Sequence, residues 1–329
     1  MQLAQLTTSV SAEVTRCDAC QWRCELGDGE TGQCQVRSGT TEGIVLHHYG
    51  LISAASIGAI EDHLLWHFFP DSRVLTVGGW GYAFPVDQQR NQYAQPPTDE
   101  SEQRRLDPNR VAVFALKKLC RGVIWAYGDP AVSSDYVLDV LRACRASSRY
   151  TAIITNGYMT LETLDSFGHY LDGISLDLRG FGEQAYKRLA GITAWQGVLD
   201  VADRARHRWN CHVEVTLRLH HGVNDDADEL RAMVAWMLTT LGDQAPLHVI
   251  PGDAGAATAS SVAFARRIAH EGGLKFVYGG EADQPTICPK CGNTLITRKQ
   301  GVVRMNGVND NTCVQCGLKL ELYNSIFKR

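Results

Sequence analysis

The sequence predicts an α/β fold: a partial barrel of the (β/α)6 type between two small cysteine-rich units. Short apolar runs alternate with helix-periodic stretches through the middle of the chain, which is the pattern of repeated strand–helix units and a parallel sheet. Eight of the eleven cysteines gather in two clusters, one near each end of the 329 residues. We therefore expect a metal-binding segment over residues 1–43, the barrel over 44–280 and a small metal-bound domain over 281–329.

Composition sets limits on partners and location. The chain is 44% hydrophobic and 21% charged, with a formal net charge of -4, so no basic surplus indicates nucleic-acid binding. No apolar run reaches the ~18 residues of a membrane span, and Met1–Val14 lacks the pattern of a secretory signal. We expect a cytoplasmic protein without nucleic-acid or membrane partners. Thiols stay reduced in that compartment, which favours metal binding by paired cysteines.

The alternation gives the elements of the barrel. Apolar runs predict strands over Arg73–Val77, Gly122–Ala126, Thr151–Thr155, Gly173–Leu178, His212–Leu217, Leu247–Ile250 and Lys275–Val277. Helical spacing predicts helices over Arg110–Leu119, Ser134–Arg145, Trp195–Arg206, Glu229–Leu241 and Ser260–His270. Gln88–Pro108 is rich in Gln, Pro, Asp and Glu and predicts a long, mobile loop. No GxGxxG motif opens a helix after a strand, so dinucleotide binding has no support.

The C-terminal cysteines predict a zinc ribbon. Cys288 and Cys291 form one CxxC turn, Cys313 and Cys316 form a second, and a glycine follows each. Each turn directs two thiolates at one ion, and two turns supply the four soft ligands of a tetrahedral zinc site. We expect Thr294–Arg304 and Lys319–Leu322 to supply the strands of the ribbon.

The N-terminal cysteines predict a second metal site. Cys17, Cys20, Cys24 and Cys34 lie within 18 residues, among several glycines. A closed structural zinc site is favoured, and an iron–sulfur cluster is the alternative because thiolates serve both. The other cysteines, Cys120, Cys144 and Cys211, lie in apolar periodic segments and are expected to be buried core residues.

Polar side chains occur where the predicted strands end, and barrels of this kind bind ligands at those ends. They are Asp129 and Asn156 after the second and third strands, Asp177 and Arg179 at the fourth, Glu214, Thr216, Arg218 and His220 on the fifth and His248 on the sixth. Carboxylates opposed to cations suit a zwitterionic or nucleoside-like small molecule.

Several segments, taken in chain order, carry a resemblance to a known family. They are the N-terminal cysteine block ending in Val36-Arg37, Ile60-Glu61 before His67-Phe68, Tyr127–Pro130, Thr155–Thr160, Asp177–Phe181, His212–Thr216, Gly222–Asp225, Pro246–His248 and the ribbon after Tyr278-Gly279. Together they resemble the radical SAM proteins of the pyruvate formate-lyase activating enzyme type, in the branch called the AmmeMemoRadiSam-system radical SAM protein. The resemblance implies S-adenosylmethionine as ligand, places Asp129 where the family has a glutamate that contacts its amino group, and implies proteins of the associated three-gene system as partners.

One motif departs from this family. Its members carry CxxxCxxC after the first strand, and three thiolates there hold a 4Fe–4S cluster with one iron open to S-adenosylmethionine. The matching positions in this chain are Trp80, Phe84 and Asp87. Aromatic rings do not ligate iron, and one carboxylate does not replace three soft ligands. The sequence therefore predicts that the usual cluster is missing.

Three hypotheses for function follow. The favoured one is a pseudoenzyme, a scaffold, regulator or ligand-binding protein in which Trp80 and Phe84 fill the space of the cluster. The second is a cluster-free enzyme that binds S-adenosylmethionine or a related nucleoside and uses polar chemistry. Its ligand would contact Asp129, Asn156, Asp177, Arg179, Thr216, Arg218 and His248, with Asp87, His220 and His248 as acid–base candidates. The third is an active radical SAM activase with a non-standard cluster.

Overall fold

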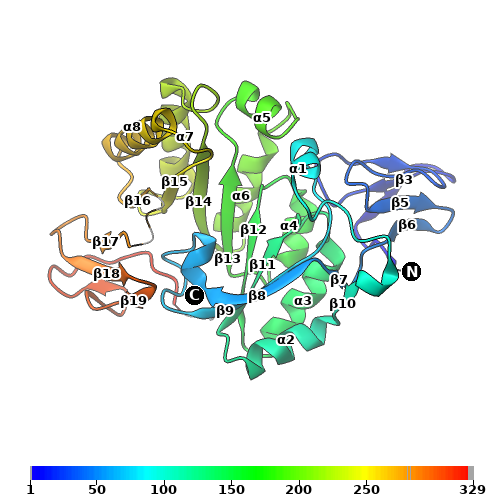
Figure 1. The fold of residues 1–329 in the computed structure, drawn as a ribbon, viewed down its shortest axis with the longest axis horizontal. Coiled ribbons are helices and arrows are strands. Elements are labelled where there is room, and N and C mark those ends of the chain that lie inside the picture. Colours follow the sequence, from blue (N-terminus) through cyan, green and yellow to red (C-terminus); the bar gives the residue numbers. More distant parts are fainter. Residues whose placement is uncertain (1, 280, 282, 325–329) are drawn as a thin grey trace.

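A sheet of eight strands occupies the centre of the described chain (Figure 1). The structure is a computed structural model and describes residues 2–279, 281 and 283–324. The strands follow in the order β16-β15-β14-β13-β12-β11-β9-β8, and only the edge strand β8 runs antiparallel to its neighbour. Their bounds are Ala54–Ala59 (β8), Arg73–Gly78 (β9), Gly122–Tyr127 (β11), Tyr150–Thr155 (β12), Gly173–Leu178 (β13), His212–Leu219 (β14), Leu247–Pro251 (β15) and Val277–Tyr278 (β16).

Helices connect these strands and pack on the sheet, α3 against β11 and β12 and α6 against β14. They span Pro85–Arg90 (α1), Pro108–Lys117 (α2), Ser134–Ala146 (α3), Leu161–Phe167 (α4), Glu183–Leu189 (α5), Gly197–His207 (α6), Ala227–Thr240 (α7) and Ala256–Gly272 (α8), with short 3-10 helices at Ile60–His63 (η1) and Glu100–Glu102 (η2). Side-chain caps fix several starts. Asp107 accepts a hydrogen bond from Asn109 N before α2, and Asp226 accepts two, from Asp228 N and Glu229 N, before α7.

The α/β class and the parallel sheet predicted from the sequence are confirmed. The seven predicted strands lie within two residues of the observed bounds. The sheet has β16 and β8 as its two edges, so closure into a barrel stays a prediction. The pattern of apolar residues in the sequence did not predict β8 or the short helices α1, α4 and α5. Part of the predicted loop Gln88–Pro108 is structured, since it contains the end of α1, η2 and β10 (Arg104–Arg105).

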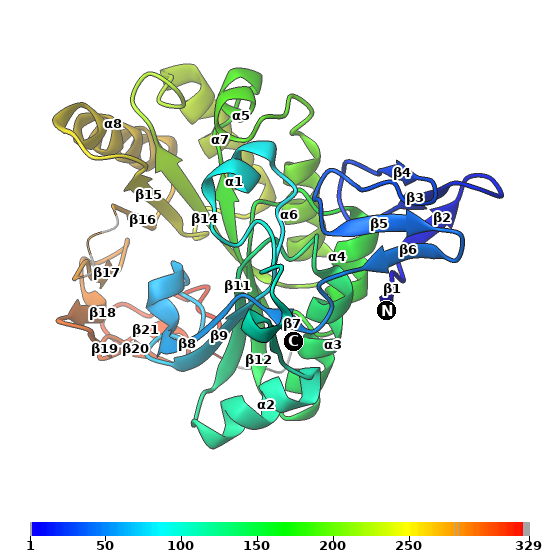
Figure 2. The same ribbon diagram turned by 45° about the vertical axis from the view of Figure 1, so that its right-hand side comes forward.

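Small antiparallel sheets form the N-terminal segment, which lies on the opposite side of the central sheet from the C-terminal ribbon (Figures 1 and 2). One sheet has the order β1-β6-β5 and another β2-β3-β4. Their strands are Gln2–Leu3 (β1), Thr7–Ser9 (β2), Thr15–Cys17 (β3), Glu25–Leu26 (β4), Arg37–Thr40 (β5) and Gly43–Leu46 (β6); β7 (Leu51–Ile52) pairs with β10.

The C-terminal ribbon packs beside β16. Its strands are Thr286–Ile287 (β17), Thr294–Lys299 (β18), Val302–Arg304 (β19), Val308–Asn309 (β20) and Thr312–Cys313 (β21). The predicted strand Thr294–Arg304 is a β18–β19 hairpin, and Lys319–Leu322 forms no strand. Arg298 joins the ribbon to the main sheet: its guanidinium lies 4.3 Å from the ring centroid of Trp66 and donates a hydrogen bond to Trp66 O at 2.9 Å.

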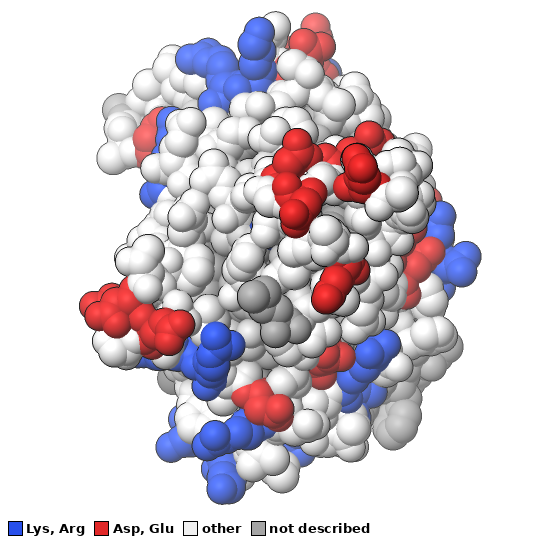
Figure 3. Space-filling view, turned by 90° about the vertical axis from the view of Figure 1, so that its right-hand side faces the viewer, with Lys and Arg blue, Asp and Glu red and all other residues white. Residues whose placement is uncertain are grey.

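The surface carries both charge signs. On the face drawn in Figure 3, Asp and Glu gather in small patches and Lys and Arg lie in others, and neither sign covers the face continuously. Within the described residues, no helix is both long enough and apolar enough to cross a lipid bilayer.

Candidate functional site

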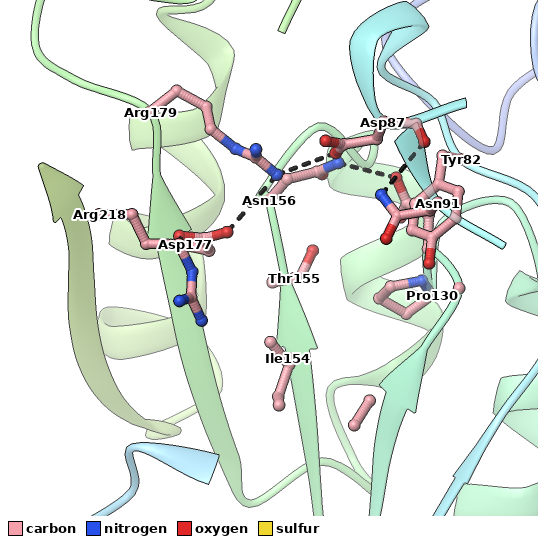
Figure 4. A pocket seen from close by; sticks show the side chains of 13 residues that line it. Tyr82, Asp87, Asn91, Pro130, Ile154, Thr155, Asn156, Asp177, Arg179 and Arg218 are labelled. Atoms are coloured by element: carbon pink, nitrogen blue, oxygen red, sulfur yellow. Dashed lines mark hydrogen bonds and ion pairs between the residues drawn. The ribbon is translucent and has the colours of Figure 1, made fainter. Parts of the chain in front are cut away.

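A cavity of about 370 Å³ opens where β11, β12, β13 and β14 end (Figure 4), and we call it the rim pocket. Its volume falls in the range of small-molecule sites. It is lined by Tyr82, Asp87, Asn91, Ala126, Gly128, Asp129, Pro130, Ile154, Thr155, Asn156, Asp177, Arg179 and Arg218. The carboxyl ends of parallel strands thus bring together side chains that lie far apart in the sequence.

Asp129 is the most firmly held carboxylate of the rim pocket. It is 3% exposed and accepts hydrogen bonds from Asn156 Nδ2 at 2.9 Å, Ala131 N at 2.9 Å and Ala83 N at 3.2 Å. The turn before it requires glycine: Gly128 has φ of +73°, and a Cβ there would lie 2.5 Å from Gly79 O. Burial raises the pKa of Asp129, although these hydrogen bonds oppose the rise.

A chain of charges crosses the floor of the rim pocket (Figure 4). Arg179 Nη2 lies 2.8 Å from Asp87 Oδ2 and 3.4 Å from Asp177 Oδ2. Arg218 Nε lies 3.9 Å from Asp177 Oδ1, and half of the Arg218 side chain is exposed. Burial raises the pKa of Asp87 to about 6, although the Arg179 guanidinium opposes the rise.

Two polar atoms in this row of charged side chains lack a hydrogen-bond partner among the described residues. They are Asp177 Oδ1 and Arg179 Nε, and both are buried. Buried polar atoms are almost always hydrogen-bonded, so such exceptions need an explanation. Both atoms belong to residues that line the rim pocket, but neither atom is itself exposed to it.

The three positions that differ from the expected cysteine motif lie around the rim pocket in different ways. Phe84 is fully buried and packs against the rings of Tyr158 and Tyr186, with centroids 5.2 Å and 6.3 Å away. Trp80 packs edge-on against Tyr93. Only Asp87 of the three is among the lining residues. The rim pocket is therefore open, and neither ring plugs it.

Four residues predicted at this site, Glu214, Thr216, His220 and His248, are not in the lining of the rim pocket. Thr216 is buried in β14 beside Asp177, with which it is paired across the sheet. His220 follows β14, and its Nδ1 lies 3.1 Å from Asp253 Oδ2. His248 is the second residue of β15, near the amino end of that strand, and is fully buried. The sequence shows that these residues are polar and lie on or next to strands. It does not show how close each one lies to the carboxyl end of its strand.

His248 belongs instead to a buried network centred on Glu214. The Glu214 carboxylate accepts hydrogen bonds from His248 Nε2 at 2.8 Å, His212 Nε2 at 2.9 Å and the backbone N–H groups of Trp66 and His67 at 3.0 and 2.8 Å. His248 also stacks on Tyr278. This network ties β14 and β15 to the Trp66 segment under the ribbon, which is a structural role for Glu214.

Asn91 is a lining residue that the sequence analysis did not identify. It follows α1, inside the stretch predicted to be a loop, and its Nδ2 donates to Asp87 O at 3.1 Å. Pro85 at the first position of α1 was the available signal, because proline is favoured at the start of a helix.

The C-terminal cysteines form a compact group that can hold a metal. Their sulfurs all lie within 4.8 Å of one another, with 3.6 Å between Cys288 and Cys316 and 3.7 Å between Cys291 and Cys313. Four thiolates around one point fit a tetrahedral ion.

The N-terminal cysteines also gather around one place. Cys17, Cys20, Cys24 and Cys34 line one small cavity of about 10 Å³. Three of them are buried and Cys24 is partly exposed. The group of ligands that could hold one metal ion, among the described residues, consists of the C-terminal cysteines and does not include them.

Comparison with known proteins places these features in a family context. Residues 93–234 match the radical SAM superfamily. The uncharacterized protein MJ0808 of Methanocaldococcus jannaschii is 27% identical over 98% of this chain and 99% of its own length. The 4-hydroxyphenylacetate decarboxylase activating enzyme of Clostridium scatologenes is 22% identical over 35% of this chain and 37% of that enzyme.

A solved structure supports the fold. A radical SAM methyltransferase from Sphaerobacter thermophilus superposes with a TM-score of 0.50 at 13% identity, covering 68% of this chain and 71% of that one. At this identity the likeness concerns the fold alone.

These findings contradict the pseudoenzyme that the sequence favoured. That hypothesis depended on Trp80, Phe84 and Asp87, which precede the matched residues 93–234. It assumed that the rings fill the site, whereas the rim pocket is open and charged. The superfamily match and the activating enzyme among the relatives point to a radical SAM enzyme. What these comparisons show for this chain is a match of residues 93–234 to the radical SAM superfamily.

Proposed function

We propose that this chain is an enzyme of the radical SAM type whose rim pocket binds S-adenosylmethionine. The observation that carries the proposal is the charge of the rim pocket, which has three carboxylates, Asp87, Asp129 and Asp177, against two guanidiniums, Arg179 and Arg218. S-adenosylmethionine has an ammonium, a carboxylate and a sulfonium, so it carries one net positive charge. A site with one carboxylate in excess complements that charge.

The amino acid part of the ligand is assigned to Asp177 and Arg218. In this proposal the ligand ammonium binds at the carboxylate of Asp177, which lines the rim pocket. The ligand carboxylate pairs with Arg218, whose side chain is half exposed and only 3.9 Å from Asp177. Asp129 keeps its hydrogen bonds from Asn156 and Ala83 and contributes negative charge near the sulfonium. Such charge-assisted hydrogen bonds are stronger than neutral ones.

The superfamily also implies an iron–sulfur cluster, and the lining of the rim pocket does not fit one. None of the lining residues is a cysteine. Phe84 is packed among aromatic rings, and Asp87 is already paired with Arg179 at 2.8 Å. A cluster needs several thiolates, so we assign no step to a cluster at this place. The rim pocket is proposed as the site of S-adenosylmethionine alone.

Calorimetry tests the binding. We expect S-adenosylmethionine to bind at least about tenfold more tightly than S-adenosylhomocysteine, because the latter lacks the sulfonium charge and a charged contact is worth about 1.5–3 kcal/mol. Equal affinity for both would contradict the charge argument. No heat with either, together with no thermal shift, would overturn the proposed function.

For the C-terminal cysteines we propose zinc, as expected for two CxxC turns around one point. The variant Cys288→Ser should lose about one zinc ion per chain, because three thiolates hold the ion less tightly than four. Metal analysis of the purified protein measures this, with Cys144→Ser, a buried cysteine of α3, as the matched control. Unchanged zinc content in Cys288→Ser would refute the assignment.

Finer features of the family assignment stay predictions from the sequence. They are the AmmeMemoRadiSam branch, partner proteins from the associated three-gene system and a cytoplasmic location.

A further inference from the structure

The helix α2 is apolar on two sides, and the described residues cover only one of them. Val111–Leu116 is an unbroken apolar run, and six consecutive residues of a helix point in all directions around its axis. The buried positions of this run lie where the helix packs on α3 and β11. The other apolar side chains of the helix, and that of a leucine just after it, are 43% to 81% exposed. They are Val113, Phe114, Leu116 and Leu119, which we call the α2 face. A helix that is apolar all round is normally buried, so this face indicates a partner.

Leu119 is not explained by the turn that ends α2. Its φ is +57°, in the left-handed region where glycine is favoured over leucine. Backbone hydrogen bonds close the turn without the side chain, from Leu119 N to Leu116 O at 3.0 Å and from Cys120 N to Ala115 O at 2.9 Å. A strained residue that carries a large, 81% exposed apolar side chain indicates a role in binding rather than in folding.

Four exposed cations border the α2 face. They are Arg110, Lys117, Lys118 and Arg121. Lys118 Nζ lies 5.6 Å from the ring centroid of Phe114, so positive charge and apolar surface are in contact. Among the described residues, no acidic side chain forms an ion pair with any of the four cations. An apolar surface with a positive border complements an apolar surface with a negative border.

A second copy of this chain does not complement the α2 face. In a symmetric dimer the same patch lies on both sides of the interface. The four cations would then face four identical cations, and like charges opposed across an interface disfavour association.

A lipid surface fits less well than a protein. Helices that lie on membranes separate their apolar face from their charged face. On α2 both kinds of side chain share the exposed side, since Arg110 precedes Val113 by three positions and Lys117 follows Phe114 by three. Burial of the apolar side chains in a bilayer would carry these charges toward the acyl chains, whereas carboxylates of a protein would pair with them.

The α2 face lies away from the rim pocket. Leu119 directly precedes β11, so it lies at the amino ends of the strands, whereas the rim pocket lies at their carboxyl ends. Figures 1 and 2 show α2 at the opposite end of the sheet from α1, whose Asp87 lines the rim pocket. A partner bound to the α2 face therefore leaves the rim pocket open.

We propose that the α2 face docks a different, acidic protein, whose contact surface has an apolar groove bordered by Asp or Glu side chains. The groove takes the side chains of Phe114 and Leu119, and the carboxylates pair with Lys117 and Lys118. This proposal is independent of the ligand of the rim pocket.

Random peptides displayed on phage and selected on the full chain provide the probe. We expect the selected peptides to combine Asp or Glu with large apolar residues, and their affinity to fall as the salt concentration rises. Binding of one such synthetic peptide, measured by fluorescence anisotropy, should weaken at least about tenfold in Phe114→Ser and in Leu119→Gly. Val302→Ser, which changes a similarly exposed apolar residue of β19, is the matched control and should bind normally. Peptides without an excess of acidic residues, or peptides that bind both α2 variants as tightly as the unmodified protein, would overturn the proposal.

Three further measurements separate the alternatives. Leu119→Gly relieves a strained backbone, so its melting temperature should equal or exceed that of the unmodified protein, and its weaker binding then does not come from unfolding. We expect no cosedimentation of the chain with phosphatidylserine vesicles and no self-association in sedimentation velocity. Vesicle binding, or a dimer, that is lost in Leu119→Gly would overturn the choice of an acidic protein as the partner.

Discussion

Replacing Asp177 by Asn should weaken binding of S-adenosylmethionine by about 10- to 100-fold. Asp177 lines the rim pocket next to Arg179 and Arg218, and in the proposed pose its carboxylate receives the ligand ammonium. The amide keeps the shape of the side chain and removes its charge, and a hydrogen bond to a charged group contributes about 1.5–3 kcal/mol.

Calorimetry measures this loss, and Asp228→Asn is the matched control. Asp228 lies on α7 with its side chain 93% exposed, so the same chemical change there should leave the affinity unaltered. Arg218→Gln is a second variant, since it removes the proposed partner of the ligand carboxylate from a half-exposed position. Affinity in Asp177→Asn equal to that of the unmodified protein would exclude the proposed pose.

Replacing Glu214 by Gln should lower the free energy of unfolding by about 3–5 kcal/mol, the usual cost of breaking a buried ion pair. Glu214 is fully buried and accepts hydrogen bonds from four donors, two histidine rings and two backbone N–H groups. A glutamine amide would turn an N–H₂ group toward donors and leave buried groups unpaired.

The size of this effect should depend on pH. Burial alone would raise the pKa of Glu214, but the hydrogen bonds and charges of His212 and His248 outweigh it and hold the pKa well below its usual range. A carboxyl whose pKa is depressed on folding contributes stability above its unfolded value, about 4.3, and loses it as the pH falls further. The difference between the two proteins should therefore be full at neutral pH and shrink below about pH 4.3.

Urea unfolding at several pH values tests both statements. Glu162→Gln is the control, because Glu162 forms a half-exposed ion pair with Arg23 and should cost no more than about 1 kcal/mol. If Glu214→Gln costs as little as the control, or costs the same at pH 7 and well below pH 4, the buried network is not the stabilising feature that we describe.

The central strands could be predicted because the apolar residues that form each strand are adjacent in the sequence. Each is a short run rich in apolar residues, and most positions of β11 and β13 are buried on both faces. The helix α5 could not be predicted in this way. It has 7 residues, about two turns, and its buried positions Ala185, Tyr186 and Leu189 show too little of the helical period to be recognised.

Part of the rim pocket could be predicted from the sequence, because the carboxyl ends of neighbouring parallel strands lie close together. Asp129, Asn156, Asp177, Arg179 and Arg218 come from the ends of four neighbouring strands and do meet there. His248 was assigned to the same site because a polar residue on a strand was taken to lie near its carboxyl end. It is instead paired with Glu214 near the amino end, and only the three-dimensional register distinguishes the two ends.

The N-terminal cysteines show a different limit. Their spacing identified them as metal ligands, but spacing alone does not separate a single ion from a cluster, because thiolates bind both. The distances between the sulfurs would separate them, and these depend on how β3, β4 and the Arg37 side chain fold around the cavity.

The most direct test of the central claim is a crystal structure of the protein grown with saturating S-adenosylmethionine. We predict density for the ligand in the rim pocket, with its amino group at Asp177 and its carboxylate at Arg218. An ordered but empty rim pocket under those conditions, or ligand density only at another place on the molecule, would contradict the claim that this pocket is the site of S-adenosylmethionine.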